Sequence, residues 1–155
     1  MEYEIIFVDT KEEAIIANKY LTMLIQDEKQ YDRNINQKCV INNFYENMFN
    51  NETACLLLVK HKSKYIGYLY GYIVDSGNAY LEKVAQLDAM YVESKYRKSG
   101  IGKKLIEEFK NWAKNKNIKF LELKVCNNNI AALKLYEKQN FKNIKTIMMC
   151  DLEEI

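Results

Sequence analysis

The sequence predicts an α/β (α+β) fold whose elements follow the order β-α-α-β-β-β-α-β-α-β. Several short runs alternate apolar and polar residues, as half-buried strands do, and longer runs repeat apolar residues at helical spacing. Glycine is rare, but two of the five glycines lie in one loop, at residues 97–102, between a strand-like and a helix-like run. The 155 residues are 48% hydrophobic and include no proline and no evident linker. We therefore expect a single domain over residues 1–155.

The first half of the chain is expected to contribute three strands and two helices. Asp9 or Thr10 is expected to cap the first helix, because both side chains accept hydrogen bonds from free helix N–H groups. The later strands are rich in β-branched and aromatic residues and flank a short polar turn, which indicates a β-hairpin. The expected elements are a strand over 2–8, helices over 11–28 and 40–49, and strands over 53–59 and 65–74.

The second half is expected to alternate strands with helices. In its first helix, apolar residues recur at helical spacing and include Trp112, so this side chain is expected in the core rather than at a ligand. The expected elements are a strand over 84–92, a helix over 100–115, a strand over 119–125, a helix over 129–139 and a closing strand over 144–151.

The strand over residues 84–92 contains an acid, Asp88, among apolar neighbours. Placing a charged side chain among apolar neighbours costs free energy unless the protein uses the charge, so Asp88 is a candidate functional residue. Period-two alternation divides the strand into two predicted faces. One face carries Gln86, Asp88, Met90 and Val92, and the other carries Leu87, Ala89 and Tyr91.

The loop that follows has the composition of a phosphate-binding loop. Basic residues, two glycines and a helix start offer backbone N–H groups and a positive dipole end, which suit a pyrophosphate. The planar guanidinium of Arg97 suits phosphate oxygens, and packing against Tyr96 is its alternative role. The candidate binding residues are Arg97, Lys98, Ser99, Gly100, Ile101, Gly102 and Lys103.

Two better-known glycine motifs do not fit this loop. A dinucleotide-binding fingerprint requires a third glycine where the chain has Leu105. A Walker-type loop requires four residues between its first glycine and Gly-Lys-Ser/Thr, but only Ile101 separates the two glycines here. The remaining alternative is an ordinary turn that uses glycine for its positive φ.

Three segments occur in a characteristic order: Leu87-Asp-Ala-Met-Tyr-Val92, Tyr96-Arg97-x-x-Gly100-x-Gly102, and Asn129-x-x-Ala132-x-x-Leu135-Tyr136-Glu-Lys-x-Asn-Phe141. In content and spacing they resemble the GNAT superfamily of N-acetyltransferases. This resemblance implies the GNAT fold, a mixed central sheet with helices on both faces. One departure is Asn140, which stands where the family usually has glycine. Asparagine tolerates the left-handed conformation, so the turn is expected to survive.

The resemblance implies that acetyl-CoA is the cosubstrate. In this family the strand over 84–92 splays from the next strand, and the pantetheine arm fills the gap like an added strand. The backbone at Met90, Tyr91 and Val92 would then hold the pantetheine, and the Met90 N–H would stabilise the oxyanion of the thioester carbonyl. Asn129 would help to hold the cofactor, with helix capping as its alternative role.

The expected catalytic residues are Asp88 and Tyr136. An alkyl amine with a pKa near ~10.4 is protonated at neutral pH, so the reaction needs a base or a lowered pKa. Asp88 is the first candidate base, directly or through water, and Glu82 is the second; some family members use the position of Gln86. Anchoring a substrate ammonium or a structural hydrogen bond is the alternative for Asp88. By resemblance, Tyr136 protonates the departing thiolate.

The expected reaction is direct acetyl transfer to a primary amine in a ternary complex, without a covalent enzyme intermediate. In this family the acceptor contacts the segment over residues 20–49, whose acids suit a small cationic amine and whose aromatics suit a peptide or protein amine. The alternatives are a non-catalytic acyl-CoA-binding sensor or interaction module, and a nucleotide-binding protein of another fold.

Charge and composition narrow the expected partners. Residues 1–92 hold 9 Lys and Arg against 13 Asp and Glu, whereas residues 93–155 hold 14 against 8, so the basic half contains the phosphate loop. The lysines form no clustered basic-aromatic face, which argues against binding of nucleic acid.

With no apolar run near the ~20 residues of a membrane span, the protein is expected to be cytoplasmic. Widely spaced cysteines and a single histidine predict no metal site, and a monomer or homodimer is expected.

Overall fold

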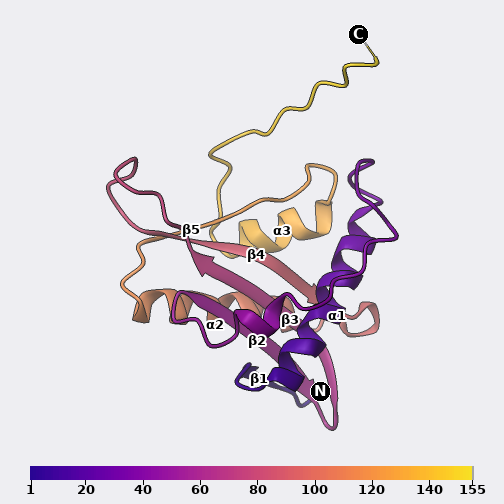
Figure 1. Ribbon diagram of the computed structural model, residues 1–155, viewed down its shortest axis with the longest axis vertical. Coiled ribbons are helices and arrows are strands. Elements are labelled where there is room, and N and C mark those ends of the chain that lie inside the picture. The colour runs from indigo at the N-terminus through magenta and orange to yellow at the C-terminus, as the bar shows by residue number, and fades with distance from the viewer. Residues whose placement is uncertain (155) are drawn as a thin grey trace.

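The computed structural model describes residues 1–154 as a mixed five-stranded sheet with helices on both faces (Figure 1). Its helices are α1 (Lys11–Glu28), α2 (Ile101–Asn115) and α3 (Ile130–Lys138), with short 3-10 turns η1 (Tyr45–Asn47) and η2 (Ser94–Tyr96). Its strands are β1 (Glu4–Phe7), β2 (Ala54–His61), β3 (Lys64–Ile73), β4 (Val84–Val92) and β5 (Phe120–Leu123). The predicted α/β architecture is confirmed. Within the described residues, no helix combines the length and apolar character that crossing a membrane requires.

The strands lie in chain order across the sheet, β1-β2-β3-β4-β5. Strands β1 to β4 pair antiparallel, and β5 pairs parallel with β4. The parallel pairing joins Val84–Leu87 of β4 to Phe120–Leu123 of β5. Because β4 continues to Val92, its second half extends beyond the end of this pairing.

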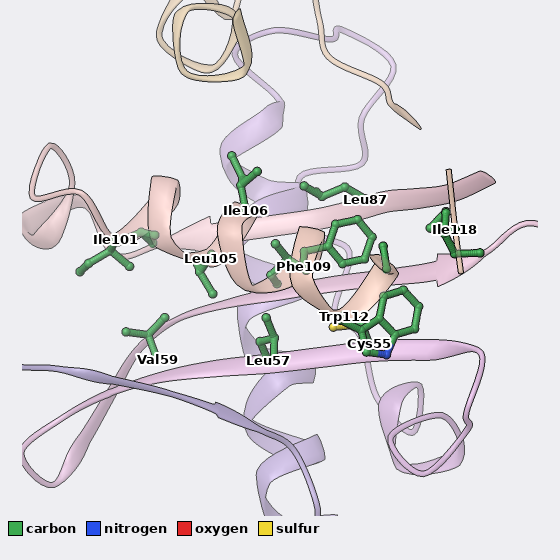
Figure 2. Packing of buried hydrophobic residues seen from close by; sticks show 14 of the residues in the cluster. Cys55, Leu57, Val59, Leu87, Ile101, Leu105, Ile106, Phe109, Trp112 and Ile118 are labelled. Atoms are coloured by element: carbon green, nitrogen blue, oxygen red, sulfur yellow. The ribbon is translucent and has the colours of Figure 1, made fainter. Parts of the chain in front are cut away.

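Separate hydrophobic layers cover the two faces of the sheet. Helix α2 packs closely on one face, with Phe109 directed at the sheet (Figure 2). Gly71 of β3 permits this approach, because a Cβ there would lie 2.4 Å from the ring of Phe109. Trp112 is buried in the same layer, as predicted. The residues that α2 buries include Leu105, Ile106, Phe109, Trp112 and Ala113. On the opposite face, α1 and η1 bury Ala14, Ala17, Tyr20 and Tyr45.

The helix predicted over residues 40–49 is wrong, because only the 3-10 turn η1 forms there. Before the turn, Asn43 adopts a left-handed backbone with φ of 55°, which interrupts a right-handed helix. The buried Asn18 of α1 then holds the turn in place. Its Oδ1 accepts the N–H of Tyr45 at 3.0 Å, and its Nδ2 donates to Glu46. Hydrogen bonds to a neighbouring helix therefore decide the conformation of this segment.

The prediction of a closing strand over residues 144–151 is wrong for the single chain. This segment has no regular secondary structure and runs away from the body beyond α3 (Figure 1). A strand forms only where its N–H and C=O groups meet a neighbouring strand edge. The segment meets no such edge among the described residues, although its residue pattern would suit one.

Candidate active site

A β-bulge in β4 presents Asp88. Tyr70 of β3 lies opposite Ala89, and the next residue of β3, Gly71, lies opposite Leu87, so Asp88 is the extra residue. The bulge interrupts the alternation of side chains: Leu87 packs in the layer beneath α2, whereas Ala89 packs in the layer beneath α1. The predicted division of this strand into two uninterrupted faces is therefore wrong. Bulges commonly re-aim a side chain beside an active site.

Beyond the bulge, two backbone amides of β4 point away from β3. The N–H of Glu93 donates to the C=O of Ile66 at 2.9 Å, which fixes which residues face β3. In an antiparallel ladder the alternate residues face the other way, and here these are Val92 and Met90. The C=O of Val92 also points away from β3, because it accepts a hydrogen bond from Nε of Arg97 at 2.8 Å.

The side to which these amides point is an open stretch of sheet edge. The pairing with β5 ends where Leu87 lies opposite Leu123, and Met90 follows farther along β4. An extended ligand with amide groups can bind such an edge as an added strand does. The predicted pantetheine contacts at Met90, Tyr91 and Val92 remain a prediction, and the pairing of β4 with β5 stops before these residues.

The loop before α2 ends in a helix start without a side-chain cap. Gly100 is the N-cap with φ of 86°, and Lys98 has φ of 60°. The first N–H groups of a helix have no acceptor inside it, and the first turn of α2 carries Lys103 and Lys104 but no acid. Lysines at this end interact unfavourably with the positive end of the helix dipole. A bound anion would be attracted both to the lysines and to the dipole. Phosphate binding here remains a prediction with suitable geometry.

Arg97 is engaged within the protein. Besides its bond to the Val92 carbonyl, its Nη2 lies 3.6 Å from the carboxylate of Asp27, and its guanidinium lies 5.1 Å from the ring centre of Tyr91. The hydroxyl of Ser99 likewise donates to a backbone carbonyl within the loop. The Arg97 fork thus joins the loop to β4 and α1. Packing against Tyr96 was the alternative role predicted for Arg97, but the ring that its guanidinium contacts is that of Tyr91.

The start of α2 lies directly against α3 and β4. A Cβ on Gly102 would lie 3.1 Å from Cδ2 of Leu135 and 3.8 Å from Cε of Met90. Gly102 therefore permits a close approach between helices, whereas Gly100 permits a positive φ. Three segments that are separate in the sequence meet at this point.

A Schellman motif ends α3 and holds Tyr136. Asn140 adopts φ of 68°, and its N–H donates to the C=O of Glu137 at 3.0 Å. The N–H of Phe141 donates to the C=O of Tyr136 at 3.0 Å, which completes the motif. The expectation that Asn140 takes the place of glycine in this turn is confirmed.

Tyr136 keeps its proton at neutral pH. Burial raises the pKa of its phenol to about 12, and the negative charge of Glu28 acts in the same direction. Burial, followed by the neighbouring Asp27, Asp32 and Asp88, also raises the pKa of Glu28. The end of α1 is therefore within electrostatic reach of both Tyr136 and Asp88. The sequence marked the acids of this region only as possible attractants for a cation, because α1 and α3 are far apart along the chain.

The environment of Asp88 favours proton uptake. Partial burial of its carboxyl raises the pKa of Asp88, although the residue as a whole is exposed, and Lys124 partly opposes the shift. A carboxylate with a raised pKa is a better base near neutral pH than an ordinary aspartate. Its assignment as the general base remains a prediction.

Two other candidate residues are used locally. Glu82 precedes β4, and its carboxylate accepts a hydrogen bond from Nζ of Lys119 at 2.9 Å, at the end of the strand remote from Met90. The structure does not bring Glu82 to the site. Asn129 caps α3, because its side chain accepts the N–H of Ala132 at 3.3 Å. This was the alternative role that its position suggested.

A family model described as the acetyltransferase (GNAT) family matches residues 21–141. This range includes the bulge of β4, the loop before α2 and the end of α3. No curated protein sequence matches the chain significantly.

Solved structures share the fold at low sequence identity. A tetramutant of the BH1408 protein from Bacillus halodurans has a TM-score of 0.81 and 16% identity, with 98% of this chain and 100% of that chain covered. The ribosomal-protein-alanine N-acetyltransferase from Brucella melitensis biovar Abortus 2308 has a TM-score of 0.69 and 17% identity, with 97% and 100% covered. AAC(6')-Iy, in complex with the bisubstrate analog CoA-S-monomethyl-acetylneamine, has a TM-score of 0.71 and 16% identity, with 97% and 98% covered.

Proposed function

Because this chain belongs to the acetyltransferase (GNAT) family, we propose that it is an N-acetyltransferase that transfers the acetyl group of acetyl-CoA to a primary amine. One observation carries the proposal: the open edge of β4, with outward amides at Met90 and Val92, meets the uncapped start of α2 and the helix α3 that carries Tyr136. Acetyl-CoA has three parts that match these features. Its anionic end suits the helix start, its amide-bearing arm suits the open strand edge, and its thioester suits the position of Tyr136.

Acetyl-CoA would bind through groups that the chain already presents. Its pantetheine arm lies along the open edge and receives hydrogen bonds from the Met90 and Val92 amides. Its diphosphate lies at the backbone of residues 98–103, where the helix dipole and two lysines favour an anion. Contact between Gly102 and Leu135 brings α3, and hence Tyr136, next to the same arm.

The transfer itself needs a proton acceptor and a proton donor. Asp88 takes a proton from the substrate ammonium, and the neutral amine attacks the thioester carbonyl. The N–H of Met90 stabilises the oxyanion of the tetrahedral intermediate. As the C–S bond breaks, the thiolate takes the Tyr136 proton, and the phenol regains a proton from the new amide nitrogen through solvent. The products are an amide, CoA and one released proton.

The acceptor is proposed to be a cationic small molecule or a peptide amine. The acidic side chains around the end of α1 support a cation, because the charges of Asp27, Asp32 and Asp88 all reach Glu28 and raise its pKa. A shallow depression beside them is lined by Met23, Gln26, Asp27 and Tyr91. One solved structure with a TM-score of 0.76 and 13% identity is named as the aminoglycoside acetyltransferase HMB0005 from an uncultured soil metagenomic sample, and the Brucella neighbour is named for a ribosomal protein. Both acceptor classes therefore belong in a screen.

Ligand-dependent thermal unfolding tests the proposal first. Acetyl-CoA and CoA should each raise the melting temperature, since a ligand at ~100 times its Kd adds roughly 2.7 kcal/mol, whereas ATP and NAD should not. Thiol release with a panel of amines then tests transfer. Tyr136→Phe should lower turnover and retain acetyl-CoA binding.

A non-catalytic acyl-CoA sensor is the alternative, and it would bind acetyl-CoA without releasing thiol for any amine. Absence of binding to either CoA species would contradict both functions.

A further inference from the structure

Lys124 is the first residue beyond β5, at the point where β4 and β5 part. The last parallel pair of these strands joins Leu87 to Leu123, so the residues that follow them, Asp88 and Lys124, stand on opposite sides of the opening between the strands. The positive charge of Lys124 acts on the Asp88 carboxyl and lowers its pKa against the effect of burial, so the two side chains lie within electrostatic reach. The chain therefore places a primary amine of its own beside the proposed general base.

The Lys124 side chain belongs to the face of the sheet that α1 covers. Leu121 and Leu123 pack in the layer beneath α2. Alternate side chains of a strand point to opposite faces, so Lys124, which follows Leu123, is directed to the other face. Asp88 acts on the same face, because its charge raises the pKa of Tyr70, which packs in the layer beneath α1. The amine and the carboxylate thus share one side of the opening.

The segment that leads from Lys124 to α3 passes beside the end of α1 (Figure 1). Nδ2 of Asn128 donates to the C=O of Tyr31 at 3.3 Å, just beyond this helix. Glu28 is the last residue of α1, and its charge acts on the buried phenol of Tyr136. Lys124 therefore leaves β5 next to the groups between which the thioester is proposed to lie.

The Lys124 amine is free to move. The residue is exposed, and its ammonium forms no ion pair with any of residues 1–154, which the structure describes. The proposed oxyanion donor, Met90, lies two residues beyond Asp88, or roughly 7 Å along a strand. Because lysine carries its amine on a flexible four-carbon stem, Nζ can reach across the opening toward this point.

We propose that the protein acetylates its own Lys124 within one chain, a reaction that rests on the proposed acetyl transfer from acetyl-CoA. Asp88 takes a proton from the Lys124 ammonium, and the neutral Nζ attacks the thioester carbonyl and forms the new C–N bond. The C–S bond breaks, and the thiolate takes the Tyr136 proton. The phenol regains a proton from the new amide nitrogen through solvent. The products are acetylated Lys124, CoA and one released proton.

Mass spectrometry of the full chain after incubation with acetyl-CoA tests the proposal. A deuterated acetyl group separates new acetylation from any that the protein acquired during expression. Lys124 should gain the label at least about a hundred times faster than Lys83, because transfer from a bound thioester is intramolecular. Lys83 is the matched control: it is exposed, has no ion pair within the described part of the chain, and precedes β4 at the end remote from Met90.

Three further measurements separate the proposed reaction from spontaneous acetylation. Excess CoA should slow the labelling of Lys124, because it competes for the cosubstrate site, and should leave Lys83 unchanged. Tyr136→Phe should slow the labelling of Lys124 by about a hundredfold and should also leave Lys83 unchanged. With acetyl-CoA in excess, the rate constant for Lys124 should stay the same on dilution of the protein, because the reaction occurs within one chain.

Equal labelling of Lys124 and Lys83 would overturn the proposal. So would a Lys124 rate that neither CoA nor Tyr136→Phe lowers, or one that falls on dilution of the protein. Failure of the proposed function gives a different result. If acetyl-CoA raises the melting temperature and added amines release thiol while Lys124 stays unlabelled, only this inference is wrong. If neither acetyl-CoA nor CoA shifts the melting temperature, both are wrong.

Discussion

Phe141 holds Tyr136 through both its backbone and its ring. The Phe141 N–H donates to the Tyr136 C=O at 3.0 Å, and the two rings meet edge-on with centroids 5.8 Å apart. A contact of this kind is the usual hydrophobic partner of a Schellman motif. The residue that follows the helix therefore fixes the direction of the proposed general acid.

Removal of the Phe141 ring should impair turnover through Tyr136. Phe141→Ala deletes the edge-on contact but keeps the backbone hydrogen bond, so we expect roughly a tenfold or greater loss of kcat with a smaller change in acetyl-CoA affinity. Steady-state kinetics and ligand-induced melting shifts measure the two effects separately. Phe7→Ala, at an exposed phenylalanine of β1, is the control and should change neither. Equal losses in the two variants would contradict a positioning role.

The left-handed turn at Asn140 should respond to glycine and alanine in opposite directions. Its φ of 68° is favourable for glycine and unfavourable for a residue with a Cβ. Asn140→Gly should stabilise the protein by about 0.5 kcal/mol, and Asn140→Ala should destabilise it by about 1 kcal/mol. Thermal unfolding checks both, because 1 kcal/mol corresponds to about 2–4 °C for a chain of this size. A stabilising alanine would contradict the assigned backbone geometry.

The raised pKa of Asp88 predicts opposite effects on activity and stability. If Asp88 is the base, kcat/KM should fall as the pH drops through its raised pKa, and Asp88→Asn should lower activity and remove this acid limb. Tyr136, with a pKa of about 12, should add no alkaline loss near neutral pH. The pH–rate profiles of both proteins provide the measurement.

Stability should change in the other direction. A group whose pKa is higher in the folded state stabilises the fold below its unfolded pKa, and that contribution is lost as pH rises through the folded pKa. Ionised Asp88 therefore opposes folding at neutral pH, and Asp88→Asn should melt at a higher temperature there, with the difference shrinking in acid. A variant that is less stable at neutral pH would point to a structural hydrogen bond instead.

Arg97 should be sensitive to a conservative change. Lysine cannot donate to the Val92 carbonyl, approach Asp27 and cover the Tyr91 ring with one planar group, so Arg97→Lys should lower stability by about 1–2 kcal/mol and weaken acetyl-CoA binding. Arg33→Lys, at the other arginine of the chain, is the matched control and should cost less than about 1 kcal/mol, because its ion pairs are exposed. Denaturant unfolding and acetyl-CoA titration compare the two variants.

Elements with a strong local pattern were predictable from the sequence. Helix α2 shows apolar residues at helical spacing, and its buried face, with Trp112 in the core, follows from that pattern alone. The turn at Asn140 was predictable for a different reason: the family that the sequence resembles usually has glycine at this position, and asparagine tolerates the same left-handed conformation. Gly100 in the loop before α2 has a positive φ, which glycine adopts without steric cost.

The amino-acid sequence by itself therefore determined the fold class, the order of most elements and the segments from which the site is built. Tertiary structure decided how those segments contact one another. It replaced the helix predicted over residues 40–49 by a turn held by Asn18, inserted a bulge at Asp88, and placed Glu28 near Tyr136. It also left residues 144–151 without a strand partner among residues 1–154, which the structure describes. Local periodicity in the sequence does not indicate such features, because each depends on hydrogen bonds or charges between residues far apart along the chain.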